Sequence, residues 1–444
     1  MKLWLKNPLN ILAENAGGGI VVECTSIVEL VPSGAQPSLP FDSVFDASSH
    51  IILPGLINLH HHFYQTLTRV FPAALNKDLF PWLKTLYPIW AKLSPEALRL
   101  GTRLALAELL LSGCTTTSDH HYIFPSGLEK SIDWQVEEAQ SLGIRVVLCR
   151  GSMDRSQKDG GLPPDSVVQT SDEILEDSER LINKYHNSNE GAMTQIALAP
   201  CSPFSVSKKV MHESSKLSKK HGVLLHTHLA ETEDENSFCL EKIGCRPLEY
   251  LEQVGWLANR TWLAHGIHFT DKEIQKLGAS KTGIAHCPSS NMLLSSGVCR
   301  VPELEKSGVP VGIGVDGSAS NDISNIMQEV RQAFLLQRLH YGSEVTHLTA
   351  LGWATEGGAN VLRRPEIGRI KLGMQSDLAL FKLDELRFSG YGDPLAALVI
   401  CGADRADRVM VAGKWLVIDG QIPGLNLSEL KTQHHKAARC LPTM

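Results

Sequence analysis

Eight short apolar runs divide most of this 444-residue chain into repeating units. The first leads from Ile51 to His60, and the others lie at residues 113–119, 143–149, 194–199, 223–228, 261–265, 282–286 and 309–316. Most successive runs are separated by enough residues for a helix, and residues 95–112 have the apolar spacing of one. Eight alternating strand and helix units are typical of a (β/α)8 barrel, so an α/β fold built on this barrel is predicted.

Short strand-like segments flank the predicted barrel on both sides. Gly19–Glu23 and Ser26–Val31 precede it, while Ser376–Phe381 and Asp407–Val417 follow it. Small β segments on both flanks of a barrel can pair with each other into one accessory sheet. We therefore expect residues 1–54 and 368–444 to form a small composite domain, and residues 55–367 to form the barrel.

Composition restricts the possible partners and the compartment. A formal net charge of −6 leaves no basic footprint, so nucleic acid is not expected as a partner. The first residues do not resemble a signal peptide, and no apolar run approaches the roughly 18–20 residues of a membrane-spanning helix, so no membrane partner is expected. The ten cysteines include no Cys-x-x-Cys pair. Free thiols favour a cytoplasmic protein.

Polar groups stand where the apolar runs end. They are His60, His62, His228, His265, His286 and Asp316. His60 and His62 are two residues apart, so in an extended chain their side chains project from the same face. The carboxyl ends of the strands carry the catalytic groups of a barrel. One histidine at a strand end is usually structural, but six such groups at the same end of a barrel indicate a metal-dependent active site.

Three imidazoles and one carboxylate make a first shell suited to zinc, with one position left for a water molecule of lowered pKa. Asp316 can contact the metal and also accept a proton from that water. Glu231 lies three residues beyond His228 and can pass a proton to a leaving nitrogen, although it also begins the acidic run Glu231–Glu235. The fourth run, residues 194–200, has no lysine that could be carboxylated to bridge two ions. One metal ion is therefore expected.

The motifs resemble those of the amidohydrolase superfamily, and more narrowly of its cyclic-amidine deaminase branch. They are Pro54–His62, His228-Leu-Ala-Glu231, Ala264-His-Gly266, Ala285–Asn291 and Gly314-Val-Asp-Gly317. Within that branch, four stretches are most similar to the 8-oxoguanine deaminases, namely His60–Arg69, Asp78–Leu83, Thr117–Tyr122 and Asp159–Asp165. The resemblance covers essentially the full chain. It implies that the flanking segments form a composite β-sandwich.

The resemblance also implies a set of site residues. The metal ligands would be His60, His62, His228 and Asp316, with Glu231 as the proton shuttle and His265 polarising or orienting the attacked group.

A second group of residues would surround the substrate. Gln65 would offer amide hydrogen bonds and Trp82 would cover an aromatic face, unless Trp82 only packs a lid. His286 would contact the substrate, or else only brace Asp316 or a neighbouring loop. His120 and His121 would be either rim contacts or solvent-facing residues.

The expected activity is hydrolytic deamination by a single zinc ion, with iron or manganese as alternatives. The expected substrate is 8-oxoguanine, which would give urate and ammonia; guanine, isoxanthopterin, S-adenosylhomocysteine or another adenosine thioether, and a hydroxytriazine are the alternative rings. A catalytically silent barrel is a rival, but such a protein would have lost a ligand or Glu231, and none is lost here. A carbon–chlorine or amide hydrolase is a further rival, although Glu231 favours an amine leaving group. A homo-oligomer, a dimer or larger, is expected.

Overall fold

Eight parallel strands form a barrel in the computed structural model, which describes residues 2–442. The strands are β7 (Leu56–Asn58), β8 (Cys114–His121), β9 (Arg145–Ser152), β10 (Thr194–Pro200), β11 (Leu225–Leu229), β12 (Thr261–His265), β13 (Gly283–His286) and β14 (Val311–Ile313). Each strand pairs in parallel with the next one along the chain. The predicted (β/α)8 fold is confirmed.

Hydrogen bonds between the first and last strands close the barrel. The Leu59 amide donates to the Ile313 carbonyl over 2.9 Å, and the Asp316 amide donates to the His60 carbonyl over 3.0 Å. The buried Asn58 side chain accepts from the Val315 amide over 2.9 Å. These contacts fix the residues that follow β7 against those that follow β14.

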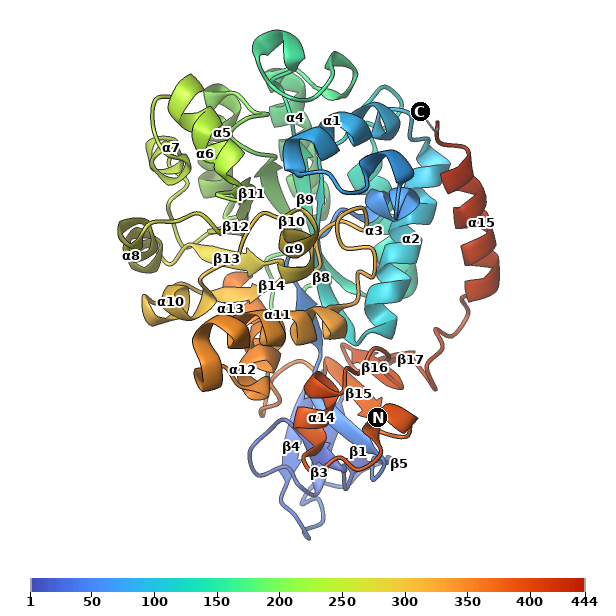
Figure 1. Ribbon diagram of the computed structural model, residues 1–444. Helices are drawn as coiled ribbons and strands as arrows, with labels where there is room; N and C mark the ends of the chain where they lie inside the picture. Colours follow the sequence, from blue (N-terminus) through green and yellow to red (C-terminus); the bar gives the residue numbers. More distant parts are fainter. Residues whose placement is uncertain (1, 443–444) are drawn as a thin grey trace.

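Helices surround the barrel, and one further helix covers its carboxyl end (Figure 1). The surrounding helices are α2 (Pro95–Leu111), α3 (Ser131–Leu142), α4 (Ser171–Tyr185), α5 (Lys208–His221), α6 (Glu233–Lys242), α7 (Pro247–Gln253), α8 (Asp271–Ser280), α9 (Pro288–Leu293), α10 (Val301–Lys306), α11 (Ile326–Tyr341), α12 (His347–Gly352) and α13 (Gly358–Val361). The loop after β7 contains the 3-10 helix η1 (Phe63–Thr68) and the additional helix α1 (Leu79–Trp90). None of the described helices is both long and apolar enough to cross a membrane.

The apolar run at residues 51–57 is not one strand. It divides at Gly55 into β6 (His50–Pro54), which belongs to the smaller domain, and β7, the first barrel strand. Gly55 lets the chain between β6 and β7 pass close to β8, because a Cβ atom on residue 55 would lie 2.1 Å from Thr115 Oγ1. His60 and His62 consequently lie in the loop after β7, and the single extended strand predicted up to them is wrong.

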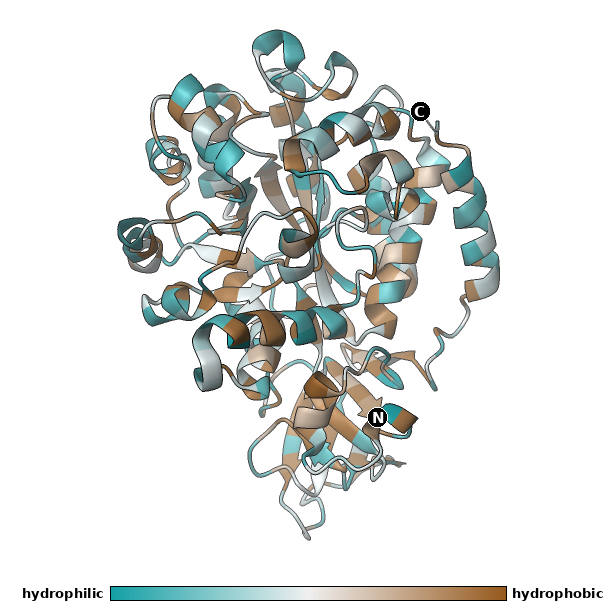
Figure 2. Ribbon diagram, viewed as in Figure 1, coloured by the Kyte–Doolittle hydropathy of each residue, from teal (hydrophilic) through white to brown (hydrophobic). Residues whose placement is uncertain are grey.

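Two sheets form the smaller domain, drawn at the bottom of Figure 1. One contains β4 (Ser26–Val31), β3 (Gly19–Glu23), β1 (Lys2–Lys6) and β5 (Ser43–Asp46), and the other contains β17 (Lys414–Val417), β16 (Arg408–Val411), β15 (Leu378–Lys382), β6 and β2 (Asn10–Ile11). Antiparallel pairing of β6 with β15 joins the two ends of the chain, as the composite sandwich requires. Figure 2 shows these strands as mostly hydrophobic. The division at residues 54 and 368 stays a prediction.

The C-terminal segment returns to the barrel after the smaller domain. Helix α14 (Pro394–Ile400) contacts α11 and α12, and α15 (Leu427–Arg439) lies along α2 (Figure 1). His434 of α15 is buried, and its Nε2 lies 3.1 Å from Thr66 Oγ1 in η1. The C-terminal segment thus contributes a helix that supports the loop after β7.

A buried ion pair fastens the barrel to the smaller domain. Arg145, at the start of β9, donates to both carboxylate oxygens of Asp377 over 3.0–3.2 Å, and both side chains are almost fully buried. The same guanidinium donates to the carbonyls of Gly191 and Ala192, while Asp377 also accepts from the Ala412 amide. Removing one partner of such an ion pair leaves the other partner as a buried charge without compensation.

We therefore expect Asp377→Ala to lower the free energy of unfolding by about 3–5 kcal/mol. Urea denaturation followed by circular dichroism measures the change. Asp172→Ala, which removes an exposed partner of Lys209, is the matched control and should change stability by less than about 1 kcal/mol. Equal effects of the two substitutions would show that the buried pair does not hold the domains together.

Candidate metal centre and active site

Four side chains converge at the carboxyl end of the barrel. His60 and His62 come from the loop after β7, His228 from β11, and Asp316 from the loop after β14. His60 Nε2 and His62 Nε2 each lie 3.3 Å from Asp316 Oδ1, and His62 Nε2 lies 3.3 Å from His228 Nε2. These are the four ligands predicted from the sequence, and the structure brings them together.

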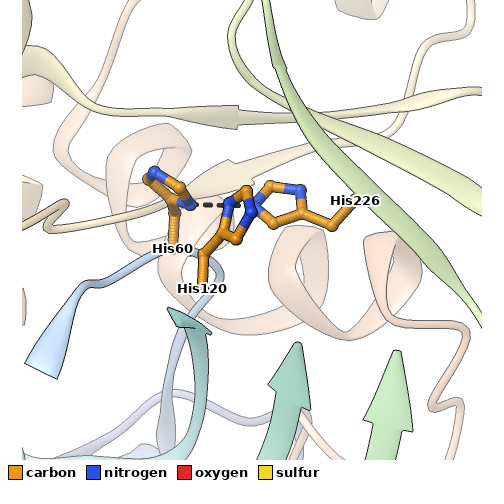
Figure 3. A group of neighbouring side chains, drawn as sticks. All are labelled: His60, His120 and His226. Carbon is orange, nitrogen blue, oxygen red and sulfur yellow. Dashed lines mark hydrogen bonds between the residues drawn. The ribbon is translucent and has the colours of Figure 1, made fainter. Parts of the chain in front are cut away.

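Hydrogen bonds orient the three imidazoles through their other nitrogen. His62 Nδ1 donates to the His120 carbonyl and His228 Nδ1 to the Cys201 carbonyl, both over 2.7 Å. His60 Nδ1 lies 2.7 Å from His226 Nε2 (Figure 3). A neutral imidazole carries one hydrogen, so donation through Nδ1 leaves Nε2 free as a ligand.

The spacing of these atoms fits one divalent metal ion. A tetrahedral site with bonds of about 2.0–2.1 Å places its ligand atoms about 3.3–3.4 Å apart, close to the 3.3 Å separations observed. His60 Nε2 is a buried atom without a hydrogen-bond partner among the described residues. Burial also lowers the pKa of His60 and His228, which keeps both imidazoles neutral. The residues present therefore suit a divalent metal.

Glu231, beside the candidate ligands, and Asp316, one of them, have pKa values shifted in opposite directions. Burial, reinforced by the charge of Asp316, raises the pKa of Glu231 well above its usual range. Burial alone would also raise the pKa of Asp316, but its contacts with His60 and His62 hold that pKa well below the usual value. The site thus contains one carboxylic acid and one carboxylate.

His265 lies between these carboxyl groups. Its Nε2 is 3.5 Å from Glu231 Oε2 and 4.0 Å from Asp316 Oδ2, and its Nδ1 is 2.9 Å from Asn291 Oδ1. The backbone is left-handed at Ala230, His265 and Asp316, with φ of 54°, 72° and 62°. Such angles are costly for residues with a side chain, so tertiary contacts must hold them. They turn the chain at the strand ends, where the polar groups meet.

A cavity opens onto this cluster. Its described lining includes four of the predicted residues besides the ligands, namely Gln65, Trp82, Glu231 and His265. It also includes residues that sequence reasoning missed: Leu79, Leu83, Tyr87, Tyr122, Cys201, Phe204, Leu294 and Ser320. Mostly apolar walls with a few polar groups are typical of a small-molecule site.

The loop after β7 places Gln65 and Trp82 in the cavity lining. Gln65 is buried in η1, and its side chain lies against Gly317. A Cβ atom on residue 317 would lie only 1.9 Å from Gln65 Oε1, so the Gln65 amide needs a glycine at residue 317. Gln65 Oε1 has no hydrogen-bond partner among the described residues. Trp82 in α1 lines the cavity and donates to the Ala319 carbonyl over 3.2 Å. The indole therefore also fastens α1 over the site.

Three other predicted histidines lie outside the cavity lining. His286 is buried at the end of β13, with Nε2 3.3 Å from the Gln337 amide nitrogen of α11. His120 and His121 were expected at the rim or in solvent, and both expectations are wrong. Strand β8 continues through His121, so both side chains are fully buried, and His120 Nε2 donates to the Ala199 carbonyl over 2.8 Å.

One tight divalent ion per chain is expected in the purified protein, measured by elemental analysis. His228→Ala removes one of the converging nitrogens and should abolish stoichiometric binding. His212→Ala, at an exposed position on α5, is the control and should retain the parental metal content. Two tight ions in the parent, or an unchanged content in His228→Ala, would contradict this assignment.

Comparison with known proteins places the chain among others with this architecture. A model of the amidohydrolase family matches residues 51–416. The chain is 59% identical to an 8-oxoguanine deaminase of Pseudomonas aeruginosa, with 99% of each chain covered. It is 34% identical to an isoxanthopterin deaminase from an unknown prokaryotic organism, covering 91% of this chain and 89% of that one.

A crystal structure of an atrazine chlorohydrolase from Arthrobacter aurescens TC1, complexed with zinc, superposes with a TM-score of 0.92 at 28% identity and covers 98% of this chain and all of that one. The extent of the family match and the identity to these relatives show that the chain belongs to the amidohydrolase family.

Proposed function

We propose that this protein is a metal-dependent deaminase that converts 8-oxoguanine and water into urate and ammonia. The observation that carries the proposal is the buried acid Glu231, 3.5 Å from His265, beside a complete set of metal-binding side chains. Hydrolysis that expels an amine needs a proton donor for the leaving nitrogen. The 59% identity to an 8-oxoguanine deaminase across the full chain supports this ring as the substrate.

The resident ion is proposed to be a single zinc, because three imidazoles and one carboxylate suit it and the chlorohydrolase of similar fold contains zinc. A bound divalent ion supplies hydroxide near neutral pH by lowering the pKa of a water molecule. His60, His62, His228 and Asp316 Oδ1 would hold the ion.

Two carboxyl groups then move protons in opposite directions. Asp316 Oδ2, which faces His265 and the Ser320 hydroxyl, accepts the proton released by the attacking water. Glu231 delivers a proton to the exocyclic nitrogen at C2 of the purine, and ammonia leaves. His265 is positioned to orient the attacked carbon–nitrogen unit, because its Nε2 lies between both carboxyl groups. The raised pKa of Glu231 suits it to the role of acid.

Unpaired polar atoms of the cavity suit an oxopurine. Gln65 Oε1 and the Tyr87 hydroxyl are both buried without hydrogen-bond partners among the described residues, and both side chains line the cavity. An amide oxygen accepts a hydrogen bond from a ring N–H, and a phenol donates one to a ring oxo group. Buried groups that a ligand must satisfy penalise any ring lacking the matching atoms.

Another cyclic amidine is the alternative substrate, since one relative of this chain is an isoxanthopterin deaminase. Both rings present lactam edges of the kind that Gln65 and Tyr87 would pair with. The homo-oligomer expected from the sequence stays a prediction.

Glu231→Gln keeps the size of the side chain but removes its acidic proton. We expect kcat to fall by at least ~10²-fold, the scale of general acid–base catalysis, while elemental analysis finds the parental metal content. Asp234→Asn, on the exposed face of the same segment, is the control and should retain activity. More than about a tenth of the parental kcat in Glu231→Gln would contradict the assigned role.

Gln65→Ala should lower kcat/KM for 8-oxoguanine by a factor that corresponds to roughly 1–3 kcal/mol of activation free energy. This is the penalty of leaving a buried polar group unpaired. Steady-state ammonia release is measured with 8-oxoguanine, guanine, isoxanthopterin, S-adenosylhomocysteine and a hydroxytriazine on parent and variant. Gln140→Ala, at an exposed position on α3, is the control. A different preferred ring on the parent would overturn the substrate while leaving the deaminase assignment intact.

A further inference from the structure

His60 differs from the other two ligand histidines in the group that accepts its Nδ1 hydrogen. His62 and His228 donate to backbone carbonyls, whereas His60 Nδ1 lies 2.7 Å from the side-chain nitrogen His226 Nε2 (Figure 3). His226 lies on β11, does not line the cavity and has no part in the proposed proton transfers. We propose that His226 is a positioning residue that fixes the tautomer of His60 and thereby sets the affinity of the metal site.

The direction of the hydrogen bonds follows from the partner of His226. Its Nδ1 lies 3.0 Å from the Trp262 carbonyl, which can only accept. Because a neutral imidazole carries a single hydrogen, His226 has it on Nδ1 and presents a bare Nε2 to His60. His60 must therefore donate through Nδ1. Its own Nε2 is then unprotonated, where it faces Asp316 Oδ1 at 3.3 Å.

Trp262 holds this pair of histidines in place from two sides. The His226 ring stacks on the Trp262 indole, with ring centroids 4.2 Å apart and an angle of 11° between the planes. The indole nitrogen donates to the carbonyl of Leu59, the residue before His60, over 3.1 Å. His60, His226 and Trp262 are all fully buried, which shields these groups from bulk solvent. The Trp262 side chain thus fixes both the His226 ring, which accepts the hydrogen bond, and the backbone next to His60, which donates it.

A second metal site formed by His60, His120 and His226 is the rival explanation of this cluster. The 2.7 Å between His60 Nδ1 and His226 Nε2 is a hydrogen-bond distance and is shorter than the roughly 3.3 Å between two ligands of one ion. His226 and His120 each use their other nitrogen on a carbonyl, as His62 and His228 also do, so the 2.7 Å distance is the observation that distinguishes a hydrogen bond from a shared ion. His60 and His226 therefore form a hydrogen-bonded pair beside the proposed metal centre.

The test compares His226→Phe with His226→Gln. Phenylalanine retains an aromatic ring against Trp262 but offers no acceptor, whereas the glutamine Oε1 can still accept from His60. Metal dissociation constants are measured by competition with a chelator at fixed pH, without any substrate. We expect binding to weaken about 10–100-fold in His226→Phe and to stay within about threefold of the parent in His226→Gln.

A second measurement needs no variant. In the metal-free parent labelled with 15N-histidine, the ring nitrogen shifts of His60 should report hydrogen on Nδ1, whereas hydrogen on Nε2 would overturn the proposal. Parental affinity in a folded His226→Phe, or equal weakening in both variants, would also overturn it. So would two tight ions in the parent and one in His226→Phe, in favour of the second metal site. None of these readouts depends on which ring is deaminated, so the proposed function is tested separately.

Discussion

The hydrogen bond from the Asp316 amide to the His60 carbonyl connects the two open edges of the barrel at the site itself. It joins residues from the first and last barrel units, so the ligand atoms depend on a contact between segments about 250 residues apart in the chain. The neighbouring bonds of Asn58 and Leu59 keep those segments in register. Closure of the barrel and assembly of the metal centre are therefore one structural event.

Burial gives this centre its chemical character. Burial lowers the pKa of His60 and His228 and keeps both neutral, whereas the contact with Asp316 raises the pKa of His62 despite its burial. Each imidazole presents Nε2 because Nδ1 is used by a fixed acceptor. The same burial keeps Glu231 protonated, while Asp316 is ionised through its histidine neighbours. One buried site thus holds an acid and a base on either side of His265, as hydrolytic deamination requires.

The barrel and the groups at its strand ends were predictable, because apolar runs and the polar residues that terminate them are local features of the sequence. His226 was missed because its role depends on a neighbour in β12, which no spacing reveals. Tyr87 was missed because it reaches the cavity only when α1 folds over the barrel. His120 and His121 were misplaced because β8 extends two residues beyond the end of the predicted run at Asp119. The uninterrupted run through Gly55 likewise concealed a change of sheet.

Helix α15 has a consequence for the order in which the protein matures. The four candidate metal-binding residues are translated by residue 316, whereas the helix that supports the Gln65 loop, Leu427–Arg439, follows about 110 residues later. During synthesis the four residues are therefore present while the substrate loop still lacks this outer support. Contacts that hold Gln65 in place are added later than the groups that would hold the metal.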